Sequence, residues 1–114
     1  MRPLPALTSS ADTVRRGEVW RYEVQTHNWL TVLVSAQSVL DQDARRVLYG
    51  VRVSADNPVD VLAVEVIIDG RTCWLNLGDG LEKLRRGCLT ERVDALDATA
   101  METVDMRFRA AMDL

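Results

Sequence analysis

The pair Asp69-Gly70 constrains the fold most, because it stands between two β-forming runs, Val61–Ile68 and Arg71–Leu77. A two-residue turn between antiparallel strands needs positive φ at both of its positions, and Asp-Gly adopts this conformation at little steric cost. The sequence therefore predicts a tight β-hairpin over residues 61–77. Gly78-Asp79-Gly80 is expected to end its second strand.

Three further strands are predicted before this hairpin. Gly17–Val24 alternates between the two faces, as a half-buried strand does. Trp29–Ser35 is continuously apolar and is expected in the centre of the sheet, and Val47–Ser54 is the third strand. We expect a polar connection at residues 25–28 and a short helical turn with a loop over residues 37–46.

The pattern changes towards the C-terminus. Lys83–Gly87 is expected to be a basic turn able to contact phosphates, and Leu89–Leu96 a sixth, shorter strand. Beyond it lies one apolar stripe at helical spacing, made of Met101, Val104, Phe108 and Met112. Asp97 is the expected N-cap, with a capping box of Thr99 and Glu102 as the alternative. The chain is thus predicted to be mainly β: an SH3-like or CcdB-like small antiparallel barrel with a C-terminal helix packed across it.

Composition limits the class of protein. A chain of 114 residues forms one domain, and we expect residues 1–14 to be a flexible N-terminal tail and residues 15–114 the folded domain. The net charge of −3 argues against a strongly basic nucleic-acid binder, although 13 of the 14 basic residues follow residue 14 and can share a face. Without a secretory or membrane-spanning run, a cytoplasmic protein with no membrane partner is predicted. Cys73 and Cys88 show no metal-ligand spacing, so no metal or cofactor is predicted.

Two motifs carry a resemblance to a known family. Arg16-Gly17-Glu18-Val19-Trp20 opens the folded part, and Leu89–Asp97 leads into the helix through Met101–Asp105. In this order, with Val32–Ser35 between them, they resemble the MazF/PemK toxin endoribonucleases of the CcdB-like barrel group. The resemblance covers residues 15–114 and implies a homodimer with an antitoxin protein as partner. It also implies metal-free cleavage of single-stranded RNA by the toxin (mRNA interferase) of a type II toxin–antitoxin system.

The cleavage implied by the resemblance is an attack of the ribose 2′-hydroxyl on the adjacent phosphate. It needs a proton acceptor, a proton donor and a cation for the phosphoryl oxygens. The Thr or Ser of the family falls on Ser54, but its Arg-Pro falls on Leu30-Thr31, and no arginine lies between residues 21 and 45. In Asp79-Gly80, glycine also replaces the Asn or Gln of the family.

Ser54, Arg52 and His27 are the candidate catalytic residues. Arg52 precedes Ser54 by two positions, so both side chains share one strand face and Arg52 can supply the missing cation. Its alternative is a surface ion pair. His27 is the only histidine and precedes the position of the missing arginine; imidazole titrates near neutral pH. An exposed loop histidine without a catalytic role is the alternative.

Arg21, Trp29, Arg45 and Arg46 are the candidate RNA-binding residues. A tryptophan beside a polar loop can stack on a base of single-stranded RNA, with a core or dimer contact as the alternative. The arginine pair can contact phosphates or form ordinary solvated surface. Arg21 can instead pair with Glu23 on the same strand face.

Two functions stay open from the sequence. The chain is either an active sequence-specific endoribonuclease or a catalytically degenerate MazF-like domain that acts by binding RNA or a protein. A gyrase poison resembling CcdB ranks below both, because the C-terminal residues that such a role requires are not evident.

Overall fold

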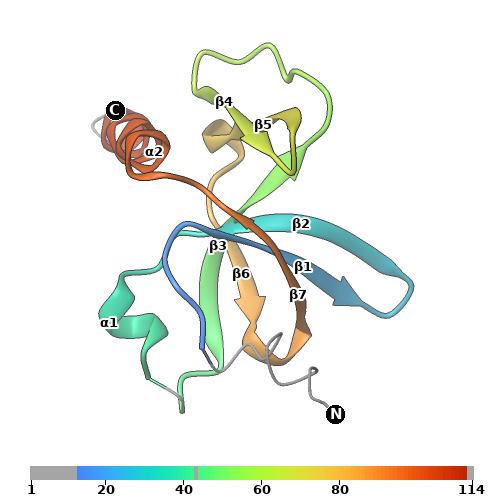
Figure 1. Cartoon of the computed structure of the whole chain (residues 1–114). Coiled ribbons are helices and arrows are strands. Elements are labelled where there is room, and N and C mark those ends of the chain that lie inside the picture. The colour runs from blue at the N-terminus through green and yellow to red at the C-terminus, as the bar shows by residue number, and fades with distance from the viewer. Residues whose placement is uncertain (1–12, 43, 113–114) are drawn as a thin grey trace.

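A long hairpin starts the sheet in the computed structural model of the chain, which describes residues 13–42 and 44–112. It joins β1 (Glu18–Val24) to β2 (His27–Leu33) and projects away from the rest of the sheet (Figure 1). Only two residues form the turn, with Gln25 at a φ of 56°. The connection expected at residues 25–28 is therefore shorter than predicted, and His27 pairs with Val24 inside the ladder.

β3 (Val47–Ser54) is the strand on which the sheet branches. It pairs with β2 on one edge, and on the other with β6 (Glu82–Arg85) at its start and β5 (Arg71–Asn76) at its last two residues. Gly50 lies in the crowded middle, where an added Cβ would stand 2.5 Å from Thr31 Oγ1 and 2.7 Å from Leu84 Cδ1. Only glycine fits at this position of β3, between β2 and β6.

The hairpin predicted around Asp69-Gly70 is confirmed. β4 (Ala63–Ile68) and β5 pair in full register, and the two turn residues have φ values of 51° and 77°. β7 (Leu89–Ala95) pairs with β1 and completes the strand order β4-β5-β3-β2-β1-β7, with β6 attached to β3. The resulting curled antiparallel sheet with one C-terminal helix confirms the predicted small β-barrel class.

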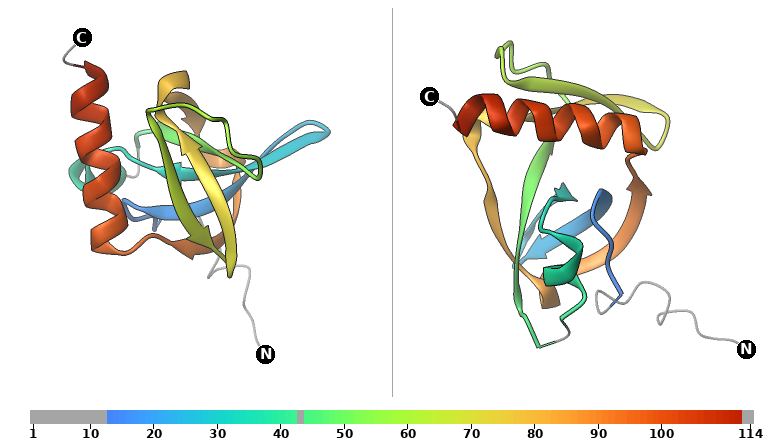
Figure 2. Two further views of the ribbon diagram at one scale, coloured as in Figure 1. Left: turned by 90° about the horizontal axis from the view of Figure 1, so that it is seen from above. Right: turned by 90° about the vertical axis from the view of Figure 1, so that its left-hand side faces the viewer.

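Short helices follow strands of the sheet, and one long helix crosses it. α1 (Gln37–Leu40) follows β2, and the 3-10 helix η2 (Leu77–Asp79) follows β5. α2 (Ala98–Met112) crosses one side of the curled sheet next to β4 (Figure 2). Its predicted N-cap is confirmed, because Asp97 Oδ1 accepts a hydrogen bond of 2.8 Å from the backbone N–H of Ala100. Among the described residues, no helix is long and apolar enough to cross a membrane.

The basic turn expected at Lys83–Gly87 is wrong in part. Its first half lies in β6 and its second half in the 3-10 helix η3 (Arg86–Cys88). Leu84 is fully buried opposite Leu48, which is why the segment pairs with β3. A four-residue strand with one buried apolar side chain is too short to show a period in the sequence.

Both faces of the sheet carry a core. One core lies between α2 and the sheet, and contains Val32, Val51, Val66, Leu75, Met101 and Val104. The other lies inside the curl, and contains Val14, Trp20, Tyr22, Leu33, Leu48 and Leu84. The flexible tail expected at residues 1–14 mostly lies outside the described residues. Val14 is a correction to it, because this side chain is buried in the second core.

Candidate functional site

Trp29, Arg52 and Glu82 form a hydrogen-bonded cluster across β2, β3 and β6, named the Trp29 cluster here. Arg52 Nη2 and Nε donate to Glu82 Oε2 over 2.8 and 3.2 Å, and Trp29 Nε1 donates to Glu82 Oε1 over 2.9 Å. The guanidinium carbon of Arg52 lies 3.7 Å from the centroid of the Trp29 ring, a cation–π contact. The three side chains thus hold one another in a single arrangement.

The Trp29 cluster is anchored to the core on one side and open to solvent on the other. The buried ring of Tyr22 lies 5.3 Å from the Trp29 ring, centroid to centroid. The side chain of Arg52 is 54% exposed and that of Glu82 is 27% exposed. Both line an open pocket of about 320 Å³, together with Asn76, Asp79, Gly80 and Leu81. A ligand in this pocket can therefore reach both charged groups.

A second pocket of about 410 Å³, named the hairpin pocket here, lies on the opposite face of β2 and β3. Its wall is largely apolar: Leu30, Val53, Ala55, Ile68, Cys73 and Val93. Its polar rim contains Arg21, Asp69, Arg71 and Thr72, and Trp29 lines it as well. Trp29 therefore links the two pockets.

The two arginines of the hairpin pocket differ in their contacts. Arg21 bonds to Glu91 Oε1 at 3.4 Å and to Asn28 Oδ1 at 3.2 Å, so its partner is not the Glu23 considered from the sequence. The exposed side chain of Arg71 makes no hydrogen bond or ion pair within the described part of the chain. An anionic ligand can therefore bind Arg71 at this rim without displacing a hydrogen-bond or ion-pair partner among the described residues.

Asp94 on β7 fixes the hairpin that covers this pocket. Its Oδ2 accepts the backbone N–H of Asp69 and its Oδ1 that of Ala95, each at 2.7 Å. These bonds, that of Asp69 first, hold the pKa of the Asp94 carboxyl below its usual value, and the charge of Arg92 adds to them. The carboxylate thereby ties the tip of the β4–β5 hairpin to β7.

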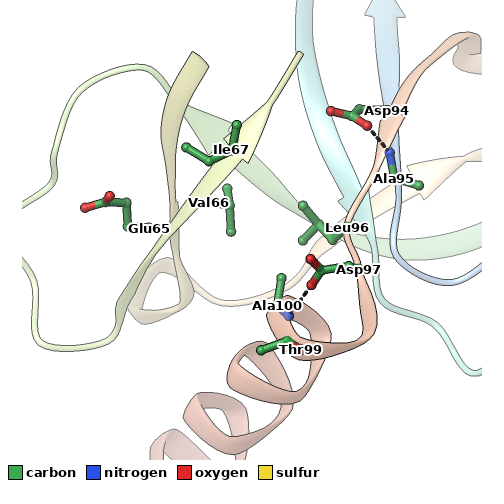
Figure 3. Close-up of a pocket in the computed structure, with 9 residues that line it drawn as sticks. All are labelled: Glu65, Val66, Ile67, Asp94, Ala95, Leu96, Asp97, Thr99 and Ala100. Carbon is green, nitrogen blue, oxygen red and sulfur yellow. Dashed lines mark hydrogen bonds between the residues drawn. The ribbon is translucent and has the colours of Figure 1, made fainter. Parts of the chain in front are cut away.

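Beside Asp94 lies a third open pocket of about 400 Å³, between β4 and the connection from β7 to α2 (Figure 3). Its charged lining consists of Glu65, Asp94 and Asp97. Three carboxylates repel a phosphate, so this pocket is a poor site for RNA.

The structure brings some of the predicted site residues together. Arg52 and Ser54 share a face of β3, and Arg21 and Trp29 meet at the hairpin pocket. Ser54 lies between Val53 and Ala55, which both line that pocket. Its hydroxyl closes a turn, because Oγ donates to Asp56 O at 2.7 Å and accepts from Asp56 N at 3.2 Å.

Other predicted residues lie apart from this region. His27 is exposed at the end of the β1–β2 hairpin, four residues from Thr31, the register partner of Arg52. At 3.3 Å per residue this is about 13 Å along β2. Arg45 and Arg46 precede Val47 at the far end of β3, about 23 Å along the strand from Ser54. His27 is two residues from Trp29 on the same strand, but within the described residues no hydrogen bond or ion pair joins its side chain to the Trp29 cluster; Arg45 and Arg46 lie at the other end of β3.

Arg86 in η3 has a structural role instead of the phosphate contact expected for the basic turn. It is fully buried, and its guanidinium donates to the carbonyl oxygens of Leu40, Gln42 and Arg45 at 2.9, 3.2 and 3.0 Å. It thus provides hydrogen-bond donors for the carbonyl oxygens at the end of α1 and in the loop that follows. The sequence showed only a run of basic residues, without the carbonyls that surround this one.

Sequence reasoning missed two residues of the region, Glu82 and Arg71. Glu82 is 30 positions from Arg52 and belongs to the strand that patterning did not reveal. Arg71 directly follows the Asp69-Gly70 turn, and this position at a hairpin tip was the one available signal for an exposed cation.

Comparison with known proteins finds the fold in endoribonucleases. No family model matches the chain, and no curated protein matches it. A solved "Endoribonuclease from Mycobacterial species" superposes with a TM-score of 0.70 at 18% identity, over 87% of this chain and 90% of the other. A second mycobacterial structure, an endoribonuclease in complex with its cognate antitoxin, gives 0.76 at 17% identity, over 90% and 97%. At such identities the likeness shows the fold alone, so this chain has the fold of these mycobacterial endoribonucleases.

Proposed function

We propose that this chain is the toxin of a type II toxin–antitoxin pair, a MazF/PemK-like endoribonuclease that cleaves single-stranded RNA without a metal. The hairpin pocket carries the proposal. It joins an aromatic ring, an apolar wall and two arginines at the position where the resemblance places the missing family arginine, Leu30. The fold shared with endoribonucleases, one of them bound to its antitoxin, supports the same function.

The hairpin pocket suits one nucleotide of an unpaired strand. Its apolar wall and the Trp29 side chain offer an apolar environment that tolerates any base. Arg71 and Arg21 at the rim offer charge for the phosphates on either side of that base. Arg71, whose side chain makes no ion pair within the described residues, thus offers local positive charge although the net charge of the whole chain is negative.

Cleavage in this proposal takes place on the other face of β3, at Arg52 and Ser54, and Trp29 connects this face with the hairpin pocket. The 2′-oxygen attacks phosphorus, the bond to the 5′-oxygen breaks, and the products are a 2′,3′-cyclic phosphate and a 5′-hydroxyl. Arg52 neutralises the phosphoryl oxygens in place of the absent family arginine, and Ser54 exchanges its hydrogen bond to the carbonyl oxygen of Asp56 for one donated to the same phosphoryl group.

The test combines purified protein, single-stranded RNA and EDTA in the buffer. We expect the wild type to cleave, and Ser54→Ala and Arg52→Ala each to lower the rate about 100-fold, which is typical of losing one oxyanion-stabilising donor. Ser38→Ala, at an exposed position in α1, is the matched control and should cleave normally. A wild type that cleaves no single-stranded RNA and does not arrest growth when expressed would rule out the nuclease.

A catalytically degenerate binding domain is the second candidate. Three features favour it: Leu30 at the arginine position, the pairing of Arg52 with Glu82, and the hydroxyl of Ser54 engaged with Asp56. For this function Ser54→Ala leaves the biological effect unchanged. A bulky change in the hairpin pocket, Cys73→Trp, abolishes RNA or protein binding.

The partners and location belong to the same proposal. An antitoxin encoded by a neighbouring gene should co-purify with the chain, and the toxin should act as a cytoplasmic homodimer. Light scattering that shows a monomer at micromolar concentration would contradict the homodimer.

A further inference from the structure

The proposed reaction needs a group that takes the proton of the 2′-hydroxyl, and the residues chosen from the sequence do not provide one. His27 lies about 13 Å along β2 from the register position of Arg52. The hydroxyl of Ser54 is not a base at neutral pH. The acceptor must therefore come from another element.

Glu82 is the carboxylate in hydrogen-bond contact with Arg52. Its Oε2 lies 2.8 Å from Arg52 Nη2, so a phosphate held by this guanidinium lies within a few ångströms of the carboxylate. Because 27% of its side chain is exposed and it lines the same open pocket as Arg52, a substrate hydroxyl can reach it. Oε2 accepts two bonds from Arg52, whereas Oε1 accepts one bond, from Trp29 Nε1, and keeps a second lone pair for a substrate proton.

The other two members of the Trp29 cluster fix the position of this carboxylate. The indole N–H of Trp29 donates a hydrogen bond to Oε1 of Glu82, and the guanidinium of Arg52 donates to Oε2. Within the described residues, Arg52 Nη1 donates to no protein atom, so its two N–H groups remain for a phosphoryl oxygen. One guanidinium can thus bind Glu82 and the phosphate together.

From this geometry we propose that Glu82 is the general base of the cleavage and that Arg52 and Glu82 act as a pair, with Trp29 as their positioning residue. The inference rests on the proposed nuclease function and assigns its proton acceptor. Glu82 takes the proton as the 2′-oxygen bonds to phosphorus. The 5′-oxygen leaves with the electron pair of its broken bond and takes a proton from water, and Glu82 later returns its proton to solvent.

The charges that face Glu82 across the pocket are Arg52 and Asp79. The guanidinium of Arg52 attracts the carboxylate of Glu82, and the carboxylate of Asp79 repels it. Because Arg52 touches Glu82 whereas Asp79 makes no hydrogen bond within the described residues, the attraction is the closer interaction. The contact with Arg52 thus fixes where the carboxylate lies in the pocket.

Glu82→Gln tests the assignment, because Gln keeps the shape and an oxygen that can accept the indole N–H, yet cannot take up a proton. We expect the rate of RNA cleavage to fall at least about 100-fold, while RNA affinity and thermal unfolding stay unchanged. The wild-type rate should fall as acid protonates carboxylates, and the residual rate of the variant should lack this limb. Glu102→Gln, at an exposed position on α2, is the control and should keep the wild-type profile.

The outcomes separate this inference from the function on which it rests. A wild type without cleavage defeats the nuclease itself. A cleaving wild type whose rate and acid limb survive Glu82→Gln overturns only the role of Glu82. If Glu82→Gln also unfolds or loses RNA affinity, Trp29→Phe decides: it removes the N–H that holds Oε1, and a normal rate in it contradicts the paired arrangement.

Discussion

The two ends of β3 hold arginines in opposite environments. Arg86, beside the start of the strand, is fully buried and bonds to three backbone carbonyls. Arg52, near its end, is more than half exposed, stacks on Trp29 and pairs with a carboxylate at an open pocket. Arg86 supplies the hydrogen-bond donors that these backbone carbonyls would otherwise lack. Arg52 keeps N–H donors that a ligand can use. What surrounds an arginine, more than its charge, separates a structural role from a chemical one.

Arg86→Met should have the largest effect on folding. It leaves the carbonyls of Leu40, Gln42 and Arg45 without their guanidinium donors, and we expect a loss of about 3–5 kcal/mol in the free energy of unfolding. Urea denaturation followed by tryptophan fluorescence measures it. Arg85→Met, the exposed neighbour, is the matched control and should change stability by less than about 0.5 kcal/mol. Equal stability of the two variants would contradict the structural role assigned to the buried Arg86.

Arg71→Ala should show the opposite behaviour, with stability intact and RNA binding weakened. Because the side chain makes no hydrogen bond or ion pair within the described residues, its loss costs the fold little. Removing one phosphate contact should weaken single-stranded RNA binding about tenfold and reduce the slope of log affinity against log salt by about 0.7. Fluorescence anisotropy at several KCl concentrations measures both quantities. Arg109→Ala on α2 is the control, and an equal loss in it would show that the contact is not specific to the hairpin pocket.

Asp94→Asn should have the smallest of the three expected effects. It applies to carboxylates the same comparison between a structural side chain and one at a pocket. Asp94 serves the backbone, whereas Glu82 faces a pocket. The pKa of Asp94 is lowered in the folded protein, so its contribution is full above the unfolded pKa and is lost as pH falls through the folded pKa. For this partly exposed group we expect a loss of about 0.5–1 kcal/mol at neutral pH.

The stability of the same variant should start to approach that of the wild type only below about pH 4, because the contribution of the carboxylate is lost as the pH falls below its unfolded pKa towards the lowered folded one. Thermal unfolding from pH 7 down to pH 3 follows this convergence, with Asp79→Asn as the control. A difference that grows as the pH falls would contradict the assigned direction of the shift.

Much of the candidate site was accessible to strand parity alone. Arg52 and Ser54 lie two positions apart on a strand whose predicted bounds match the structure, so their common face followed from the pleat. Glu82 did not follow, because β6 is defined by its pairing with β3 and has one buried apolar residue. In the sequence Arg71 is only the first residue of a predicted strand, and the folded β4–β5 hairpin places it with Leu30 and Trp29 around one pocket.

The sequence by itself determined the local elements: the Asp69-Gly70 turn, which depends on positive φ, and the start of α2, which depends on the side chain of Asp97. These features involve residues within a few positions of one another. Only the tertiary structure decided that Arg86 is buried, that Val14 belongs to the core and that Arg52 meets Glu82 on Trp29. Such contacts join strands far apart in the chain, and their partners are set by the curl and register of the whole sheet.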